Sequence, residues 1–380
     1  MSKRDFDHQL REPGAAVYGQ RSRWLRFQFD PVLLLLLLAV MGVGLMVLYS
    51  AGDSGHAQLR RQAVYMAGGL VVMLITAQLS PRFLARWAWL PYVLAVLLLL
   101  AVDLMGSDAK GARRWLELGP LRFQPAELMK IALPLVLAAY LGARPLPPRL
   151  RHLATTLAIM VVPLVLVILQ PDLGTAVLIA ANGAFLLFLA GVGLRYIAGA
   201  VLAALIAIPL MWSFVLHEYQ KTRVLTLLDP ESDKLGAGWN IIQSTTAIGS
   251  GGWFGKGWMQ GTQSQLDFLP EGHTDFIIAV LAEELGLVAV LGLLAVYLLI
   301  ILRGVVISLA APSPFSRLLA GSLVLTFFVY VFVNMGMVAG LLPVVGVPLP
   351  MISYGGTSVV TLSLGFGILM AIQSENGGRG

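Results

Sequence analysis

Cysteine is absent from the 380-residue sequence, and charged residues are scarce. The lack of cysteine excludes disulfide bonds, thiolate metal sites and thiol nucleophiles. Only 12% of the residues are Asp, Glu, Lys or Arg, compared with roughly 25% in an ordinary soluble domain. No phosphate-loop pattern GxxxxGK[ST] occurs, so nucleotide hydrolysis is not indicated. The few charged residues that remain are therefore the main candidates for chemistry.

Apolar residues make up 58% of the sequence, and its mean hydropathy is +0.82. A membrane-spanning helix needs about 20 predominantly apolar residues. Several segments approach this length, and together they predict an all-α polytopic membrane protein with about ten transmembrane helices. The predicted spans are 31–50, 62–79, 86–104, 125–142, 153–170, 174–192, 195–216, 274–302, 317–339 and 356–374.

The distribution of Lys and Arg predicts that both termini are cytoplasmic. With the N-terminus inside, 15 of the 26 Lys and Arg residues lie inside and ten lie outside, which is a moderate positive-inside bias. Residues 1–30 form a basic tail, either an interfacial anchor or disordered, without the features of a cleaved signal peptide. The membrane domain is 31–375, its large external loop is 217–273, and 376–380 form a short cytoplasmic tail. The net charge of +6 does not by itself indicate a nucleic-acid partner, and none is expected.

Asp275 lies at the outer end of the predicted eighth helix. It has two interpretations, because Thr274 or Asp275 could cap that helix, or Asp275 could act as a general base at the membrane boundary. Glu283 and Glu284 lie deeper in the same helix. A charged residue at the bilayer centre costs about 2.5–3.5 kcal/mol, so these two glutamates require a partner or protonation.

Lys130 is the candidate partner. Glu127 and Lys130 are three residues apart on the predicted fourth helix, so they share a face and can form a local ion pair. Alternatively, Lys130 reaches across to Glu283 or Glu284. In that case the four residues form a polar network that supports the site without taking part in the chemistry.

The external loop 105–124 combines cations with an aromatic residue. Lys110, Arg113 and Arg114 precede Trp115, and this grouping suits a pyrophosphate next to a sugar or prenyl chain. A solvated loop with an interfacial Trp is the alternative. Asp172, in the turn between the fifth and sixth spans, is either a turn residue or a second acidic group facing the site.

A divalent cation, Mg²⁺ or Mn²⁺, is a further possibility for cofactor. His273 and Asp275 are two residues apart, and Asp267 and Glu271 are near them in the sequence. No recognised ligand spacing is present, so no metal-binding residue is assigned, and His273 is taken as a substrate-binding candidate.

Two irregular segments are expected to pack against the membrane domain or its surface rather than to form free loops. The loop 217–273 contains several Trp and Phe residues, which favour a re-entrant or surface-lying segment. The segment 340–358 is rich in Pro and Gly, and irregular backbone at membrane depth is tolerated where it lines a cavity. Asn334, inside the ninth span, is able to hydrogen-bond across the bundle.

Four long motifs resemble the SEDS family of cell-wall polymerases. Their residues are similar to those of the members that act in cell elongation rather than in division. The likeness covers about residues 30–375. The motifs are WLELGPLRFQPAELMK, QPDLGTA, GSGGWFGKGWMQGTQSQLDFLPEGHTDFIIAVLAEELG and GLLPVVGVPLPMISYGGTS.

The resemblance implies a ten-helix fold and polymerisation of lipid II into glycan strands at the outer face of the bacterial inner membrane. It implies that the essential acidic residue is Asp275, that the functional loop Trp is Trp115, and that Glu127 and Lys130 are functional. Gly272 stands where relatives vary and often carry a basic residue. The family also implies a partner, a class B penicillin-binding protein that crosslinks the glycan.

The chemistry of the residues is compatible with this reaction. Asp275 would deprotonate the 4-hydroxyl of the acceptor while undecaprenyl diphosphate leaves the donor glycan, and Lys110, Arg113, Arg114 or a divalent ion would stabilise the diphosphate. Two other classes remain as alternatives. One is a flippase for the lipid-linked precursor or an ion-coupled transporter, since intramembrane Glu and Lys residues also suit proton relays. The other is a scaffold that only recruits the penicillin-binding protein.

Overall fold

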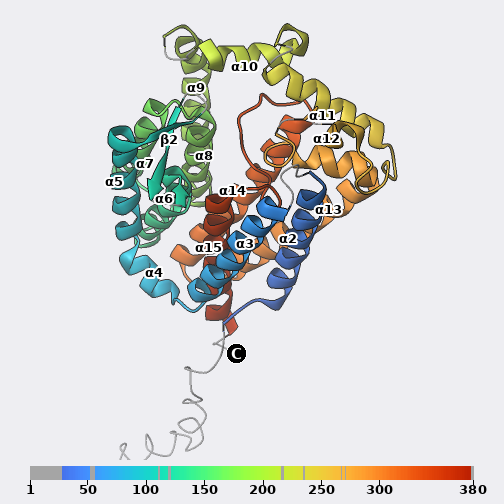
Figure 1. Cartoon of the computed structure of the whole chain (residues 1–380). Coiled ribbons are helices and arrows are strands. Elements are labelled where there is room, and N and C mark those ends of the chain that lie inside the picture. The colour runs from blue at the N-terminus through green and yellow to red at the C-terminus, as the bar shows by residue number, and fades with distance from the viewer. Residues whose placement is uncertain are drawn as a thin grey trace, which may run out of the picture.

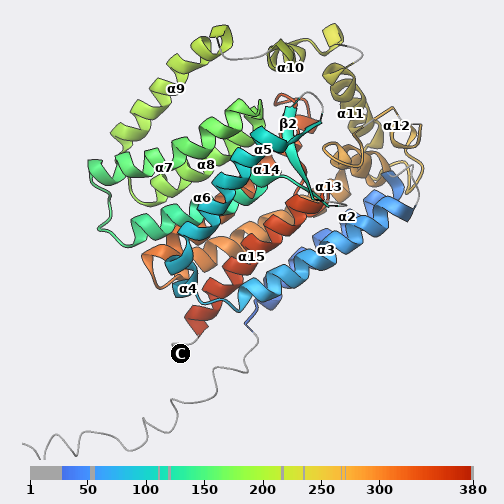
Figure 2. The same cartoon turned by 60° about the vertical axis from the view of Figure 1, so that its left-hand side comes forward.

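The computed structural model describes residues 28–51, 56–109, 112–118, 121–214, 218–233, 236–266, 268–269 and 271–377. Long apolar helices run roughly side by side and form one bundle (Figures 1 and 2). The prediction of a helical, polytopic membrane protein is confirmed by this architecture. Most of the predicted tail 1–30 and the last three residues lie outside the described residues.

Every predicted span is largely helical in the structure, with boundaries that differ by up to eight residues. The sixth, seventh, ninth and tenth spans are α8, α9, α14 and α15, and the long eighth span is α13. The α-helices are α2 (Pro31–Ala51), α3 (His56–Ala77), α4 (Pro81–Trp87), α5 (Trp89–Met105), α6 (Pro125–Gly142), α7 (Leu150–Leu169), α8 (Leu173–Leu189), α9 (Leu194–Phe214), α10 (Glu218–Leu228), α11 (Ala237–Gly251), α12 (Thr262–Gln265), α13 (Ile277–Ala310), α14 (Pro314–Val338) and α15 (Gly356–Gly377).

Length and composition alone give fewer spans than the predicted ten. Within the described residues, seven helices are individually long and apolar enough to cross a membrane, and α3 with α4 would add one if this pair, bent by 98°, is a single span. The apolar helices α5 and α8 have 17 residues each, at the short end of the range of about 17–25 residues for a spanning helix. The count of ten spans therefore stays a prediction.

Helix α6 is the core of the bundle. In its spanning window 72% of the residues are buried, against 22% in α7. Pro125 begins the helix, where its missing N–H and fixed φ are compatible with a first helical turn. Because α6 packs against α5, α7, α8 and α14, any polar side chain on it must find its partners inside the protein.

Helix α13 is interrupted at Gly286, which has φ 74° and ψ −174°. A preceding loop, residues 252–257, fills the interruption with backbone hydrogen bonds. Lys256 N and Gly257 N donate to the carbonyls of Glu283 and Glu284, and the N–H groups of 287 and 288 donate to the carbonyls of 252 and 253. A Cβ at Gly286 would lie 2.3 Å from Gly255 N, so only glycine fits at this joint.

A small antiparallel sheet is the one addition to the predicted all-α fold among the described residues. It consists of β1 (Ser107–Ala109), β2 (Ala112–Leu118) and β3 (Leu121–Phe123), in the order β1-β2-β3. The sheet occupies the predicted external loop 105–124 and leads directly into α6. It therefore gives Trp115 and its neighbours a defined position next to that helix.

The predicted loop 217–273 is largely helical. It contains α10, the short 3-10 helix η2 (Pro230–Asp233), α11 and α12. Figure 1 shows α10 extending from the end of α9 toward α11 across the top of the molecule. Helices α11 and α12 contact α13 and α2, so this part of the segment packs on the bundle, and its place relative to the membrane stays a prediction.

Candidate active site

A cavity of about 790 Å³ opens at the α10–α11 end of the bundle, between β2, α6, α8 and the segments before α13 and α15. Three of its lining residues are cationic and four are acidic. The lining residues are Arg114, Trp115, Gln124, Glu127, Lys130, Asp172, Thr175, Thr222, Arg223, Asn240, Glu271, Thr274, Asp275, Phe276, Val344, Val345, Gly346, Val347, Pro348, Tyr354, Gly355, Thr357 and Ser358.

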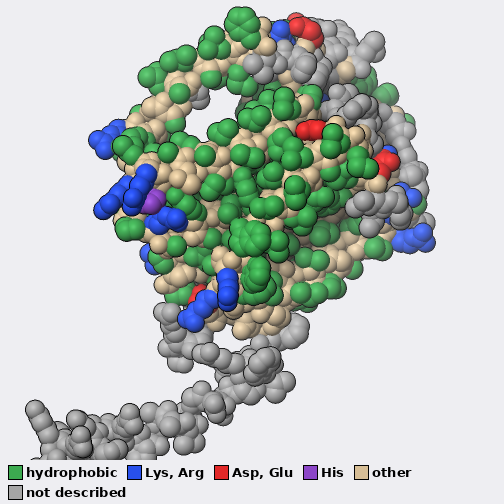
Figure 3. All heavy atoms as spheres, turned by 90° about the vertical axis from the view of Figure 1, so that its left-hand side faces the viewer, with side chains coloured by type: hydrophobic (Ala, Val, Ile, Leu, Met, Phe, Trp, Pro, Cys, Tyr) green, Lys and Arg blue, Asp and Glu red, His purple; other side chains and the backbone are tan. Residues whose placement is uncertain are grey.

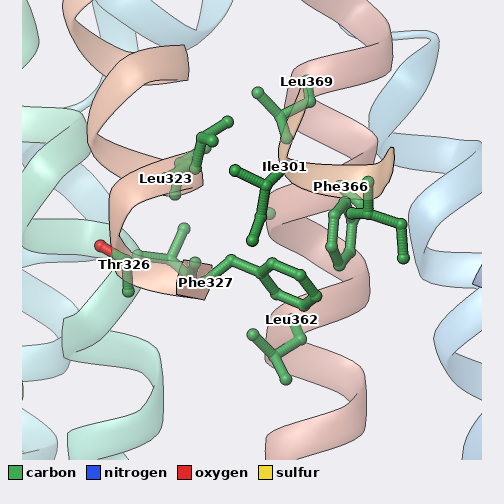
Figure 4. Close-up of a pocket in the computed structure, with 11 residues that line it drawn as sticks. Ile301, Leu323, Thr326, Phe327, Leu362, Phe366 and Leu369 are labelled. Carbon is green, nitrogen blue, oxygen red and sulfur yellow. The ribbon is translucent and has the colours of Figure 1, made fainter. Parts of the chain in front are cut away.

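A second cavity, of about 30 Å³, lies among α6, α13, α14 and α15. Figure 4 shows that its walls are aliphatic and aromatic side chains, with the hydroxyl of Thr326 at the edge. That hydroxyl is already bonded to Asn182 Oδ1 and the Ser322 carbonyl. No residue that lines this small cavity can titrate, so the chemistry belongs to the large one.

Asp275 lies in the wall of the large cavity, in the turn that precedes α13. Helix α13 begins at Ile277 with Phe276 at its N-cap position, so neither Thr274 nor Asp275 occupies the capping position. The Asp275 carboxylate faces Gly346, because a Cβ at Gly346 would lie 3.5 Å from Asp275 Oδ2. With φ at 75°, Gly346 has a backbone conformation that favours glycine, so the chain can pass close to the carboxylate.

Asn334 of α14 fixes the backbone of Asp275. Its side-chain Nδ2 donates to the Asp275 carbonyl at 2.8 Å and to the Val347 carbonyl at 2.7 Å. The predicted cross-bundle hydrogen bond of Asn334 is therefore present. It joins the turn before α13 to the irregular segment before α15.

The segment before α15 holds the same turn at two more points. Ser353 Oγ donates to the Thr274 carbonyl at 2.6 Å, and Tyr354 N donates to the His273 carbonyl at 3.0 Å. Residues 344–348 and 354–355 line the cavity, as predicted for irregular backbone rich in Pro and Gly. The peptide groups of the turn are thus anchored, while the Asp275 side chain stays at the cavity wall.

Arg114 and Asp172 are in contact at the cavity lining, where β2 approaches the start of α8. Arg114 Nε lies 3.6 Å from Asp172 Oδ2, and Arg114 Nη2 donates to the Pro171 carbonyl at 3.1 Å. Asp172 also accepts from Gln124 Nε2 at 3.2 Å and caps α8 through Thr175 N at 3.3 Å. Asp172 is therefore both a turn residue and a cavity residue, which combines its two interpretations.

Lys130 forms the local ion pair rather than the long-range one. Its Nζ lies 2.6 Å from Glu127 Oε1, and it lies 4.8 Å from the centre of the Tyr330 ring. Thr361 Oγ1 is 3.4 Å from the other oxygen of Glu127. Both members of the pair line the cavity and are more than nine-tenths buried, so they form a charged floor that is neutral overall.

Glu283 and Glu284 do not join this pair, and the predicted four-residue support network is corrected to three separate sets of contacts. Glu283 is fully buried, and its Oε1 lies 2.7 Å from Lys256 Nζ. It also accepts from Gln263 N at 2.9 Å and Ser264 N at 3.1 Å. Glu284 accepts a hydrogen bond from Ser50 of α2. Neither glutamate lines the cavity, because both side chains are directed to the loop after α11 and to α2.

Three predicted substrate-binding residues are not among the described residues that line the cavity. Lys110 lies outside the described residues, and for Arg113 only the backbone position in β2 is described. His273 is beside the cavity lining rather than in it, with its ring 6.3 Å from that of Tyr354. Trp115 lines the cavity, as predicted.

Several cavity residues were not predicted. Arg223 and Asn240 come from α10 and α11, which cover the cavity from the long segment between α9 and α13. Glu271 lies in the turn before α13, where its Oε2 accepts from Thr274 Oγ1 at 2.7 Å. A helical pattern within 217–273 is the signal in the sequence that would have placed Arg223 and Asn240 near the site.

The helical bundle defines a multi-pass membrane protein with a large polar cavity suited to chemistry. The protein-family model for FtsW, RodA and SpoVE, described as "Cell cycle protein", matches residues 25–377. The chain belongs to this family, which is the SEDS family indicated by its motifs.

Sequence relatives cover nearly the whole chain. Peptidoglycan glycosyltransferase MrdB of Escherichia coli K12 is 51% identical over 357 residues, which cover 94% of this chain and 96% of the relative. A probable peptidoglycan glycosyltransferase FtsW of Trichlorobacter lovleyi is 36% identical over 363 residues, with coverages of 91% and 93%.

Solved structures share the fold. A chain from a structure described as "Structural coordination of polymerization and crosslinking by a peptidoglycan synthase complex" superposes with a TM-score of 0.80 at 33% identity, covering 93% of this chain and 99% of that one. Rod shape determining protein RodA of Thermus thermophilus superposes with a TM-score of 0.71 at 31% identity, with coverages of 93% and 98%.

Proposed function

We propose that this protein is a peptidoglycan glycosyltransferase of cell elongation, which polymerises lipid II into glycan strands with Asp275 as the general base. One observation carries the assignment of the base. The Asp275 side chain lies in the wall of a 790 Å³ polar cavity, while Asn334 fixes its backbone. A carboxylate at a wall of this kind can meet a substrate hydroxyl, whereas one enclosed by packing cannot.

The reaction is a single displacement with inversion, similar in logic to that of inverting glycosidases. The Asp275 carboxylate takes the proton of the acceptor 4-hydroxyl, and that oxygen attacks the anomeric carbon of the donor. The bond from this carbon to the diphosphate oxygen breaks, and undecaprenyl diphosphate leaves with the electron pair. Asp275 then returns its proton to water. A positioned base of this type contributes about 10²- to 10⁴-fold to the rate.

The departing diphosphate requires positive charge. Arg114 of β2 and Arg223 of α10 both line the cavity, and arginine matches phosphate geometry with two parallel donors. Arg114 keeps about a quarter of its side chain exposed at 23%, so it can meet a ligand without leaving Asp172. Lys130 is paired with Glu127, so its charge is neutralised and it adds little to the attraction of the diphosphate.

A divalent cation, as proposed from the sequence, would add positive charge next to the diphosphate. No group of three or more His, Asp or Glu side chains that could hold a metal ion is found among the described residues. Mg²⁺ is often held by one or two carboxylates together with substrate phosphates. We therefore assign no metal ligand among the described residues, and the divalent cation stays a proposal.

The proposed setting is the bacterial inner membrane, with both termini cytoplasmic and the cavity at the outer face. The lipid tails of substrate and product would remain in the bilayer while their head groups enter the cavity. The proposed partner is a class B penicillin-binding protein, which would crosslink the product. Its basis is the structural relative that belongs to a synthase complex for polymerisation and crosslinking.

The test is polymerisation of labelled lipid II by the purified protein and its Asp275→Asn variant. We expect the variant to lose activity by about 10²-fold or more, because the amide cannot accept the hydroxyl proton. Asp103→Asn is the matched control, since Asp103 is an exposed carboxylate of α5 outside the cavity. It should retain full activity.

Thermal unfolding of both variants shows whether they are folded. Full polymerisation by a folded Asp275→Asn protein would contradict the assignment of the base. Faster transfer of lipid II across liposomes, with no polymer formed by the unmodified protein, would favour a transporter instead. Partner binding with no polymer and no transfer would favour the scaffold.

A further inference from the structure

A cluster of arginines lies at the end of the bundle away from the active-site cavity. It comprises Arg144 after α6, Arg149 and Arg151 at the start of α7, and Arg195 at the start of α9, with His152 among them. Figure 3 shows Lys and Arg side chains gathered along one rim of the large apolar face, next to a histidine. We refer to these five residues as the arginine corner.

Within the described residues, no carboxylate forms an ion pair with the arginine corner. Between Lys130 and His217 the only acidic residue in the sequence is Asp172, at the opposite end of α7 and α8. Arg149, Arg151 and Arg195 are exposed. The corner is therefore a concentration of positive charge without an ion-pair partner in the described part of the chain.

Two turns bring the corner together. The α6–α7 turn and the α8–α9 turn are in contact, because a Cβ at Gly191 would lie 3.7 Å from Pro147 Cβ. Arg149 follows Pro147 by two residues, and Arg195 follows Gly191 by four. Cations from both helical hairpins thus converge on one part of the surface.

Aromatic rings hold two of the guanidinium groups. The Arg144 guanidinium lies 3.5 Å from the centre of the Tyr140 ring, and that of Arg195 lies 4.7 Å from the centre of the Tyr196 ring. The Tyr140 hydroxyl lies 3.4 Å from His152 Nδ1. A guanidinium stacked on a ring is restricted in motion yet keeps N–H donors at its edge. The positive-inside rule requires only that cations be present, and it does not explain this ordering.

The neighbours of the corner are apolar and exposed. Leu146, Leu150 and Leu194 expose 39%, 64% and 79% of their surface. Leu150 and Leu194 begin helices that are apolar enough to span a membrane, and Leu146 lies in the turn before one of them. Phosphate head groups meet acyl chains at this level. Positive donors beside exposed leucines match an amphiphile with an anionic head and an apolar tail.

We propose that the arginine corner is a binding site for the head group of an anionic phospholipid, of the phosphatidylglycerol type. Two phosphate oxygens would accept from the guanidinium edges, and the glycerol and upper acyl chain would lie along the exposed leucines. In the proposed orientation the corner faces the inner leaflet. The site is separate from the active-site cavity and does not depend on catalysis.

The test is titration of the detergent-purified full-length protein with phosphatidylglycerol, with the first bound lipid measured by native mass spectrometry. The variant Arg149→Gln/Arg151→Gln should bind this first lipid about 30-fold more weakly, because each surface cation contributes about 1 kcal/mol to attraction of an anionic lipid. The control Arg82→Gln/Arg86→Gln removes the same charge from two exposed arginines of α4 at the same end of the bundle. It should change the affinity less than twofold.

Two further arms identify the ligand. Phosphatidylcholine should bind at least tenfold more weakly than phosphatidylglycerol, and soluble glycerophosphoglycerol should not displace the lipid at equal concentration. Equal losses in both double variants, no loss in either, equal binding of phosphatidylcholine, or displacement by the soluble head group would each overturn the proposal. Variants that unfold at the same temperature as the unmodified protein are folded. The Asp275→Asn variant should bind the lipid as tightly as the unmodified protein does, whatever its polymerisation activity.

Discussion

Asn334 shows how one uncharged side chain can determine the position of a reactive carboxylate. It is fully buried and donates to two carbonyls, one in each of the segments that meet at Asp275. We expect Asn334→Leu to lower both stability and turnover. Each buried carbonyl without a donor costs about 1–3 kcal/mol, and a displacement of about 1 Å at the reacting group can lower the rate about 10²-fold.

The measurement is the thermal unfolding temperature together with kcat and KM for lipid II polymerisation. Thr326→Val is the matched control, since Thr326 is a buried polar residue of the same helix, eight residues earlier and away from the large cavity. It should lower stability with little change in kcat. If the two variants lose kcat equally at equal stability, Asn334 has no positioning role.

At the residue scale, the sequence predicted those site residues whose chemistry is unusual for their surroundings. Arg114, Trp115, Asp172 and the Glu127–Lys130 pair all line the cavity with Asp275. Charges in or beside apolar spans are costly and therefore conspicuous. Arg223 was overlooked, because an arginine in a long polar segment is not conspicuous until α10 is known to cover the cavity.

At the scale of elements, the loop that packs at the interruption of α13 explains why Glu283 has a different partner from the predicted Lys130. The break at Gly286 comes after Glu283 and opens a place for this loop. In the structure the loop 252–257 completes the broken backbone at Gly286, and Glu283 binds that loop through Lys256. Helix periodicity predicts which face of a helix a residue occupies. It does not predict which residue, distant in sequence, forms an ion pair with it, because that depends on tertiary packing.

The Lys256–Glu283 pair gives a direct test of this loop attachment. Lys256→Met leaves the fully buried Glu283 carboxylate without its cation, and Glu283→Gln leaves the lysine without its anion. We expect each single variant to lower the free energy of unfolding by about 1–3 kcal/mol, and the double variant to lose less than the sum. The measurement is a double-mutant cycle of unfolding in detergent. Simple additivity would show that the two side chains do not interact.

At the scale of the whole molecule, apolar periodicity was sufficient for the fold class and for every long helix. It was not sufficient for the bend between α3 and α4, which measures 98°, or for the sheet β1–β3. These features depend on local turns and on strand pairing between short polar segments, for which a hydropathy pattern contains little information.

The orientation of the bundle is the remaining whole-molecule prediction, and the absence of native cysteine makes it testable with single cysteines. Ala143, after α6, and Glu231, in η2, are both exposed, and they lie on opposite sides of the membrane if both termini are cytoplasmic. An impermeant maleimide should label Glu231→Cys in spheroplasts and Ala143→Cys only after lysis. The physical basis is the excess of Lys and Arg on the cytoplasmic side. Labelling in the reverse order would place the cavity inside the cell, where it could not extend a glycan at the outer face.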